Sequence, residues 1–504
     1  MARTRQNFMG GAAILAGAVA VTKLLGAVYK IPLGNLLDSE GMAHFYAAYN
    51  IYSLLLVLST AGLPVALSRL VARAAAQHRY AGARRGFRMA LALLASIGLL
   101  CSAVMCAMPQ VLAGWLHDEA AAYAIRALGP AVALVCVSSA LRGFGQGLGD
   151  MLPTAAGQVT ESAGKLVIGL ALCLLLLKQN AAPELCAAGA IGGVTAGAAL
   201  GLLVTACLTA RRCTLPEARD VPPRRRELLR QLLSVGVPIT VGAAGMSLIT
   251  LLDQALVTST LRDTLGYSAA ETSALYGQYT FGMTLFQLPP SFIYPVSVSL
   301  MPAITAALPA GAGLSVLAEP ILLLLYPAVP DTARAAAYHL TFLGLACVFV
   351  CLMVATNGVL QAYGRPGVPV FTLLCGGVMK IVTNYLMVGD PATGIRGAAV
   401  STLYCYALIV VLNLIAIARC VPERPGYIGL FARPLLLTAV MALAARSSYG
   451  LLAQVLPERW AVLPAILIAA AVYVLLVLAT GTVTRQELLA LPKGEKIAQI
   501  LRLR

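Results

Sequence analysis

Charged side chains are scarce in this chain of 504 residues, and acidic ones are the scarcest. Only 11% of the residues are charged, with 20 acidic against 36 basic side chains, while 60% are apolar and the mean hydropathy is +0.85. Soluble domains carry about 25% charged residues, so this composition excludes a soluble enzyme. The four histidines show no metal-ligand spacing, and no Ser/His/Asp constellation accompanies them.

Closely spaced cysteine motifs, which are typical of metal sites and redox sites, are also absent from the sequence. The 12 cysteines include no Cys-x-x-Cys motif, and most of them lie inside apolar runs, which predicts buried free thiols without a disulfide or metal role. The glycine run Gly143-x-Gly145-x-Gly147-x-Gly149 follows an apolar helix and lacks a Lys-Ser/Thr dipeptide. It therefore indicates no nucleotide site, and we expect no cofactor.

Apolar runs long enough to cross a bilayer recur along the whole chain. A helix needs about 20 apolar residues to span the hydrocarbon layer. Fourteen runs approach or exceed this length, at residues 8–30, 44–68, 88–108, 121–141, 152–177, 186–210, 231–257, 275–304, 305–327, 336–362, 368–388, 395–418, 428–453 and 460–483. The sequence therefore predicts an all-α integral membrane protein with about fourteen transmembrane helices.

Basic residues gather on one side when alternate loops are assigned to alternate sides of the membrane. Most of them fall on the side of the N-terminus, including the groups within residues 69–88 and 211–230. Cytoplasmic loops are enriched in Lys and Arg, so both termini are predicted to be cytoplasmic, with an amphipathic tail on the inner leaflet. Topology then accounts for most of the formal charge of +16. No stretch outside the membrane is long enough for a nucleic-acid-binding module.

The two halves of the chain resemble each other. An offset of 215 residues superposes Gly143, Gln146, Gly149 and Lys165 on Gly358, Gln361, Gly364 and Lys380, and a slightly larger offset superposes Tyr49-x-x-Tyr52 on Tyr276-x-x-Tyr279. Chance recurrence of small residues is the alternative. We interpret the matches as two parallel six-helix repeats, which gives a first lobe at 1–210, a basic linker at 211–230, a second lobe at 231–420, and two extra spans with the tail at 421–504.

Several charges fall within the predicted spans, where each costs about 2.5–3.5 kcal/mol on insertion scales. Lys23 and Lys30 lie two turns apart on one face, and Glu161 and Lys165 have the i, i+4 spacing of a structural ion pair. Lys380 and Asp253 complete the set, because Glu319 is expected at an outer helix end. The interior is then net positive and suited to a phosphate-bearing anion.

Some of these assignments remain open. Lys30 either faces the interior or reaches the outer surface. Asp253 is either a structural partner of a lysine, a coupling-ion site, or both. The tyrosines either line a cavity or lie at the membrane interface, where tyrosine is also enriched; they are Tyr49, Tyr52, Tyr276 and Tyr279.

Four stretches carry a family resemblance: residues 22–32 (TKLLGAVYKIP), 59–72 (STAGLPVALSRLVA), 288–304 (LPPSFIYPVSVSLMPAI) and 313–321 (GLSVLAEPI). With them the chain resembles the stage V sporulation protein B branch of the polysaccharide exporter family, in the multidrug/oligosaccharidyl-lipid/polysaccharide exporter superfamily. The resemblance implies two six-helix lobes plus two C-terminal helices. It also implies a flippase for an undecaprenyl-pyrophosphate-linked saccharide such as lipid II, with Lys23 and Lys30 meeting the pyrophosphate.

One departure and two alternatives accompany this resemblance. Relatives carry a charged loop and an additional half-helix where this chain passes directly through residues 305–314, so the crossing at 305–327 is the least secure. A multidrug or cation antiporter on the same scaffold would need acidic cavity residues, for which Asp253 and Glu161 are the candidates. A membrane glycosyltransferase using Asp38 and Glu40 is opposed by its short external loops. Membrane lipids and cell-wall synthesis proteins are the expected partners.

Overall fold

The structure is a computed structural model that describes residues 8–217, 220–293, 300–365, 367–420 and 427–481. In these ranges the chain is helical, as predicted, and contains no strand. The elements are α1 (Phe8–Thr60), α2 (Leu63–Ala76), α3 (Tyr80–Ala107), α4 (Pro109–Trp115), η1 (Glu119–Ala121), α5 (Ala122–Gly147), α6 (Leu152–Lys178), α7 (Pro183–Arg212), α8 (Arg225–Ser259), η2 (Thr260–Thr264), α9 (Ala269–Phe286), α10 (Leu288–Ile293), α11 (Leu300–Val316), α12 (Ala318–Leu325), α13 (Pro330–Ala362), α14 (Gly367–Val388), α15 (Arg396–Cys420), α16 (Tyr427–Leu452) and α17 (Glu458–Thr480).

The predicted count of fourteen spans is not confirmed in the described part of the chain. Eleven stretches in the described part of the chain qualify by length and composition, or twelve when the bent pair Ala303–Val316 and Ala318–Leu325 is taken as one span. This pair bends by 77°, at the crossing that the sequence marks as least secure. The predicted span at 275–304 is divided among α9, α10 and α11, and residues 294–299 lie outside the described ranges.

The first two predicted spans belong to one continuous helical stretch that is bent inside α1. Asp38 interrupts the helix with φ 57° and ψ −168°, a left-handed conformation that is unusual for a residue other than glycine. Its carboxylate accepts a hydrogen bond from the Ser39 backbone N–H at 2.6 Å. This bond begins the second half of α1, so the predicted break between residues 30 and 44 exists as a bend rather than as a loop.

The chain forms two compact units. Of the described residues, unit 1 comprises those within 8–262 and 268–274, and unit 2 comprises those within 263–267 and 275–481. Helix α8, which the sequence places at the start of the second lobe, packs in unit 1 against α1, α2 and α3. Asn50 donates a hydrogen bond to Gln254 at 2.7 Å, and the Gly62 backbone N–H donates to Thr240 at 3.2 Å. These contacts attach α8 to the helices that precede the linker.

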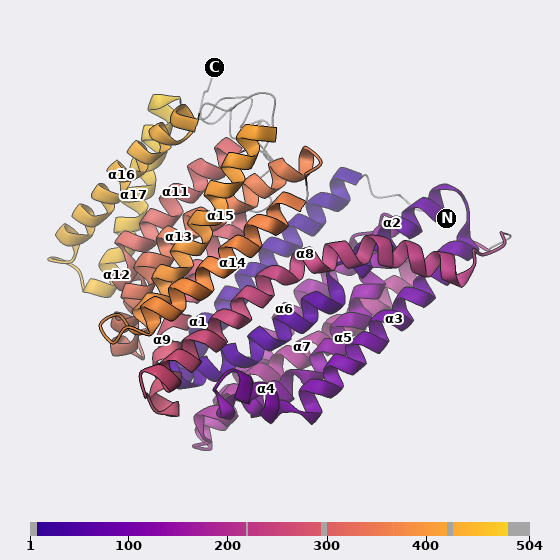
Figure 1. Ribbon diagram of the computed structural model, residues 1–504, viewed down its shortest axis with the longest axis horizontal. Helices are drawn as coiled ribbons and strands as arrows, with labels where there is room; N and C mark the ends of the chain where they lie inside the picture. The colour runs from indigo at the N-terminus through magenta and orange to yellow at the C-terminus, as the bar shows by residue number, and fades with distance from the viewer. Residues whose placement is uncertain (1–7, 218–219, 294–299, 366, 421–426, 482–504) are drawn as a thin grey trace. The chain divides into compact units, whose positions relative to one another are not determined.

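Helices α6 and α7 of unit 1 run alongside each other at very short separation (Figure 1). Gly193, Gly197 and Gly201 repeat every four residues on α7, the small-residue spacing that allows membrane helices to approach closely. A Cβ at Gly193 would lie 2.2 Å from the Gly169 Cα of α6, and one at Gly197 would lie 2.5 Å from the Glu161 carbonyl oxygen. Only glycine therefore fits at these positions.

Unit 2 buries its C-terminal helix pair against α11 and α12. Leu317 packs in one apolar cluster with Leu437, Met441 and Val462 from α16 and α17. The Tyr473 hydroxyl donates a hydrogen bond to the Thr305 carbonyl oxygen at 2.8 Å. The two extra helices are thus an integral part of unit 2.

Candidate cationic sites

Two lysines from different helices of unit 1 meet the same tyrosine ring. The Lys30 Nζ donates a hydrogen bond to the Tyr46 hydroxyl at 3.0 Å and lies 5.2 Å from the centroid of the Tyr49 ring. The Lys165 Nζ of α6 lies 6.0 Å from the same centroid and 5.3 Å from that of Tyr29. Ammonium groups are attracted to aromatic faces at such distances. The rings therefore hold two positive charges near one another.

The rings come from successive turns of α1. After the bend at Asp38, Phe45 stacks on Tyr49 with centroids 6.0 Å apart, and Tyr49 contacts Tyr52 at 5.9 Å. Residues three and four positions apart share a helix face, which explains the alignment. Tyr29, from the half of α1 before the bend, is anchored by its hydroxyl, which donates to the Ala190 carbonyl oxygen at 2.7 Å.

The predicted ion pair between Glu161 and Lys165 is not the one that the structure forms. Glu161 instead pairs with Arg142 of α5, and the Arg142 Nη2 lies 2.7 Å from the carboxylate. The prediction is wrong because helical spacing considers one helix alone, whereas Arg142 approaches from its neighbour. In the described part of the chain, no carboxylate lies within 4 Å of Lys30 or Lys165, so both charges remain without an acidic counter-ion.

The other candidates of unit 1 have different surroundings. Lys23 lies on the first half of α1 with its side chain exposed. Asp253 is buried in α8 with 3% of its surface exposed, beside Gln254, which receives the hydrogen bond from Asn50. Among the described residues, no group of three or more His, Cys, Asp or Glu side chains is placed to hold a metal ion.

Unit 2 contains a second lysine–tyrosine cluster. The Lys380 Nζ donates a hydrogen bond to the Thr402 hydroxyl at 3.0 Å, and the Tyr279 hydroxyl lies 3.0 Å from the same oxygen. The Tyr276 and Tyr279 rings are 5.9 Å apart, and His339 packs edge-on against Tyr279 at 5.7 Å. Thr402 and His339 were missed in the sequence. His339 could have been noticed as a lone histidine in the apolar run of α13. No feature of the sequence distinguishes Thr402.

The two clusters share one pattern. The ring centroids of Tyr49 and Tyr52 are 5.9 Å apart, and the two ring planes meet at 48°. In the matched pair, Tyr276 and Tyr279, the centroids are also 5.9 Å apart and the planes meet at 54°. Each cluster also contains one of the matched lysines at positions 165 and 380. This agreement supports the predicted duplication, which remains a prediction.

The amino-acid sequence matches the family model described as polysaccharide biosynthesis protein over residues 8–308. The chain belongs to this family. Three relatives are from Bacillus subtilis (strain 168). The membrane protein YabM is 27% identical over 98% of this chain and 96% of its own length. Stage V sporulation protein B is 26% identical over 83% of this chain and 85% of its own length. Lipid II flippase MurJ is 23% identical over 82% of this chain and 83% of its own length.

Solved structures share the fold of this polysaccharide biosynthesis family member. The lipid II flippase MurJ in an inward closed conformation aligns with a TM-score of 0.62 at 13% identity, covering 93% of this chain and 97% of that one. An inward-facing multidrug resistance transporter aligns with a TM-score of 0.60 at 15% identity, covering 84% of this chain and 98% of its own. The predicted resemblance is confirmed, and so is the prediction of a multi-pass membrane transporter rather than an enzyme.

Family membership and geometry together overturn one alternative. A glycosyltransferase using Asp38 and Glu40 does not agree with relatives and neighbouring folds that are transporters. The structure gives Asp38 a different role, because its carboxylate binds the Ser39 backbone at the bend of α1. In this polysaccharide biosynthesis family member, Asp38 shapes a helix.

Proposed function

We propose that this transporter moves an undecaprenyl-pyrophosphate-linked saccharide, such as lipid II or a related cell-wall or spore-cortex precursor, across the cytoplasmic membrane by alternating access. The proposal includes cytoplasmic termini and leaves any coupling ion unassigned. Relatives described as lipid II flippase and stage V sporulation protein B support it. The observation that carries it is the pair of lysines, Lys30 and Lys165, around Tyr49 without an acidic counter-ion.

The chemistry of this site matches a pyrophosphate. Lysine is an effective point-charge partner for phosphate, and a low-dielectric surrounding strengthens the attraction. Tyr46 and Tyr49 hold the Lys30 ammonium through a hydrogen bond and ring contacts before any substrate arrives. Such preorganisation lowers the entropy lost on binding. Lys23, exposed on the same helix, would extend the positive path, and cell-wall synthesis proteins would act before and after the transporter.

Complementation of a Bacillus subtilis strain depleted of its lipid II flippase tests the proposal. We expect Lys165→Glu and Lys30→Glu each to abolish growth and Lys165→Arg to retain much of it, because the site needs the sign of the charge more than its shape. We expect the same order for Lys23→Glu and Lys23→Arg. Lys178→Glu is the matched control, since Lys178 is an exposed lysine on the same helix as Lys165. Normal growth of a Lys30→Glu, Lys165→Glu double variant at wild-type protein levels would contradict the proposal.

Buried Asp253 supports a second candidate, a cation-coupled drug antiporter on the same fold. This function needs an acid that binds H⁺ or Na⁺, and its activity should not depend on Lys30 or Lys165. Drug efflux from cells that express the protein distinguishes the two. Efflux that is lost in Asp253→Asn but retained in Lys165→Glu would favour the antiporter, whereas the opposite sensitivity in complementation favours the flippase.

A further inference from the structure

We propose that a basic pocket at the start of α3 binds the phosphate headgroup of an anionic membrane lipid. The pocket has a volume of about 560 Å³ and is lined by Ala81, Arg84, Arg85, Arg88, Met89, Ala92, Pro222 and Arg225. Four of these eight residues are arginines and none is acidic. The site is separate from Lys30 and Lys165, so it serves a resident lipid rather than the transported one.

The pocket is formed by two segments that are held together by hydrogen bonds. We call residues 213–217 and 220–224 the linker clasp. The Asp220 carboxylate accepts hydrogen bonds from the Ala81 backbone N–H at 2.8 Å and from that of Gly82 at 3.3 Å. In return, Arg84 donates to the Leu215 carbonyl oxygen at 3.0 Å and Arg85 donates to that of Pro223 at 2.9 Å. The wall of the pocket is therefore built before a ligand binds.

Two of the arginines keep their full hydrogen-bonding capacity. Arg88 and Arg225 are exposed, and in the described part of the chain their side chains make no hydrogen bond or ion pair with protein groups. A guanidinium carries five donors in a planar fork that fits phosphate oxygens bidentately. The nearby Asp220 carboxylate is already engaged by the two backbone N–H groups. The pocket thus presents positive charge to a ligand.

The position of the pocket along α3 favours a lipid. This helix has 28 residues, and at 1.5 Å per residue it is about 42 Å long, against a hydrocarbon thickness of about 30 Å. The basic first turns therefore extend into the headgroup layer, on the side that the basic loops predict to be cytoplasmic. Met89 and Ala92 continue the face of Arg85 and Arg88 toward the apolar part of the helix. The phosphate would contact the arginines, and the acyl chain would contact Met89 and Ala92.

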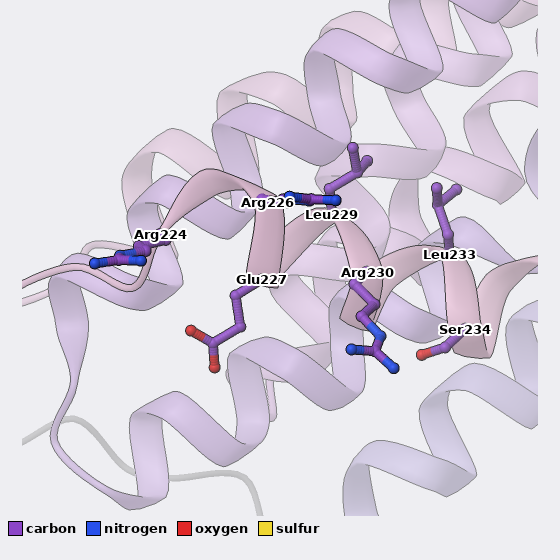
Figure 2. Close-up of a pocket in the computed structure, with 7 residues that line it drawn as sticks. All are labelled: Arg224, Arg226, Glu227, Leu229, Arg230, Leu233 and Ser234. Carbon is purple, nitrogen blue, oxygen red and sulfur yellow. The ribbon is translucent and has the colours of Figure 1, made fainter.

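A neighbouring pocket provides a built-in control. It has a volume of about 860 Å³ and is lined by Arg224, Arg226, Glu227, Leu229, Arg230, Leu233 and Ser234. Figure 2 shows these side chains spread along a single stretch, the start of α8. It contains three arginines and one acid, and all of its lining comes from this one stretch. A general attraction of anionic lipid to arginine would act on both pockets, whereas the proposed site requires the arginines of the first pocket.

The test measures lipid binding to the purified full-length protein. Native mass spectrometry in detergent counts retained phosphatidylglycerol, cardiolipin or phosphatidylcholine, and thermal unfolding measures the stabilisation by each lipid. We expect the two anionic lipids to bind and to raise the unfolding temperature, and phosphatidylcholine to do neither. An Arg88→Gln, Arg225→Gln variant should bind anionic lipid about tenfold more weakly, because it loses two charge-assisted contacts. The control variant, Arg226→Gln, Arg230→Gln, should bind as the wild type does.

Two results would overturn the proposal. Equal loss of anionic lipid in the pocket variant and the control variant would show a general effect of surface charge. Stabilisation by inorganic phosphate that equals that by phosphatidylglycerol, and that is lost in the Arg88→Gln, Arg225→Gln variant, would identify a site for soluble anions and not for a lipid. Both substituted arginines are exposed and unbonded, so the variants should fold, and the unfolding temperature without lipid confirms this.

Discussion

At the scale of single residues, the Arg142–Glu161 pair joins α5 to α6 with side chains that are 11% and 25% exposed. Removing either partner leaves a poorly hydrated charge without its counter-ion. We expect Arg142→Gln or Glu161→Gln to lower the free energy of unfolding by about 1.5–3 kcal/mol, and the double variant to cost less than the sum. Chemical denaturation in detergent micelles measures this. Lys165→Gln is the control, because Lys165 does not pair with Glu161. It should change transport and leave the free energy of unfolding unchanged. Single variants as stable as the wild type would disprove the pair.

At the scale of elements, glycines set the distance between α6 and α7. Gly193→Ala places a Cβ 2.2 Å from the Gly169 Cα, and both helices are held by other neighbours, since α6 also packs against α1 and α7 against α5. We expect a destabilisation of about 1–3 kcal/mol, typical of overpacking. Gly192→Ala is the matched control, because a Cβ at this neighbouring position meets only the Leu172 Cδ1, at 3.8 Å. The unfolding temperatures of the two variants compare the positions directly, and equal values would refute the close packing.

The linker clasp has a pH dependence of its own. The hydrogen bond from the Ala81 backbone N–H holds the pKa of the Asp220 carboxyl below its ordinary value of 3.8. A lowered pKa means that the stabilisation is fully present above pH 3.8 and is lost as the pH falls through the lower, folded-state pKa. Asp220→Ala should therefore unfold at a lower temperature than the wild type at pH 7, and the difference should shrink in acid. Glu217→Ala, in the same linker, should unfold at the same temperature as the wild type. If the difference in unfolding temperature between Asp220→Ala and the wild type does not change with pH, the Asp220 carboxylate is not its cause.

At the scale of the whole molecule, the distribution of basic residues predicts which ends of the helices face outward. We expect impermeant thiol reagents to label cysteines engineered next to Asp118 and Asp263 from outside the cell, and to leave those next to Arg84 and Arg225 unlabelled. The exposed native thiol of Cys207 is replaced first in every variant. The predicted cytoplasmic position of Lys493 lies outside the described residues, and labelling there from outside would indicate an odd number of crossings, most simply through the bent pair α11 and α12.

The sequence by itself determined the helical membrane class of the protein, and it predicts a net positive interior. Hydropathy and the positive-inside bias are sums over the residues of one segment or loop, so both can be evaluated without knowing how the helices pack. The lysines at 30 and 165, the paired tyrosines and the weak crossing near residue 305 could be named for this reason. The resemblance at residues 22–32 and 59–72 likewise depends on order along the chain alone, and the family match confirms it.

Only the tertiary structure decided which of these groups meet. Spacing within α6 predicted a Glu161–Lys165 pair, but Arg142 lies on another helix and takes the carboxylate, which leaves Lys165 with Tyr29 and Tyr49. Helix α8 follows the linker in the sequence, yet its contacts with α1, α2 and α3 place it in unit 1. Partners that are distant in the chain come together through packing of whole helices, a long-range property that local periodicity does not contain.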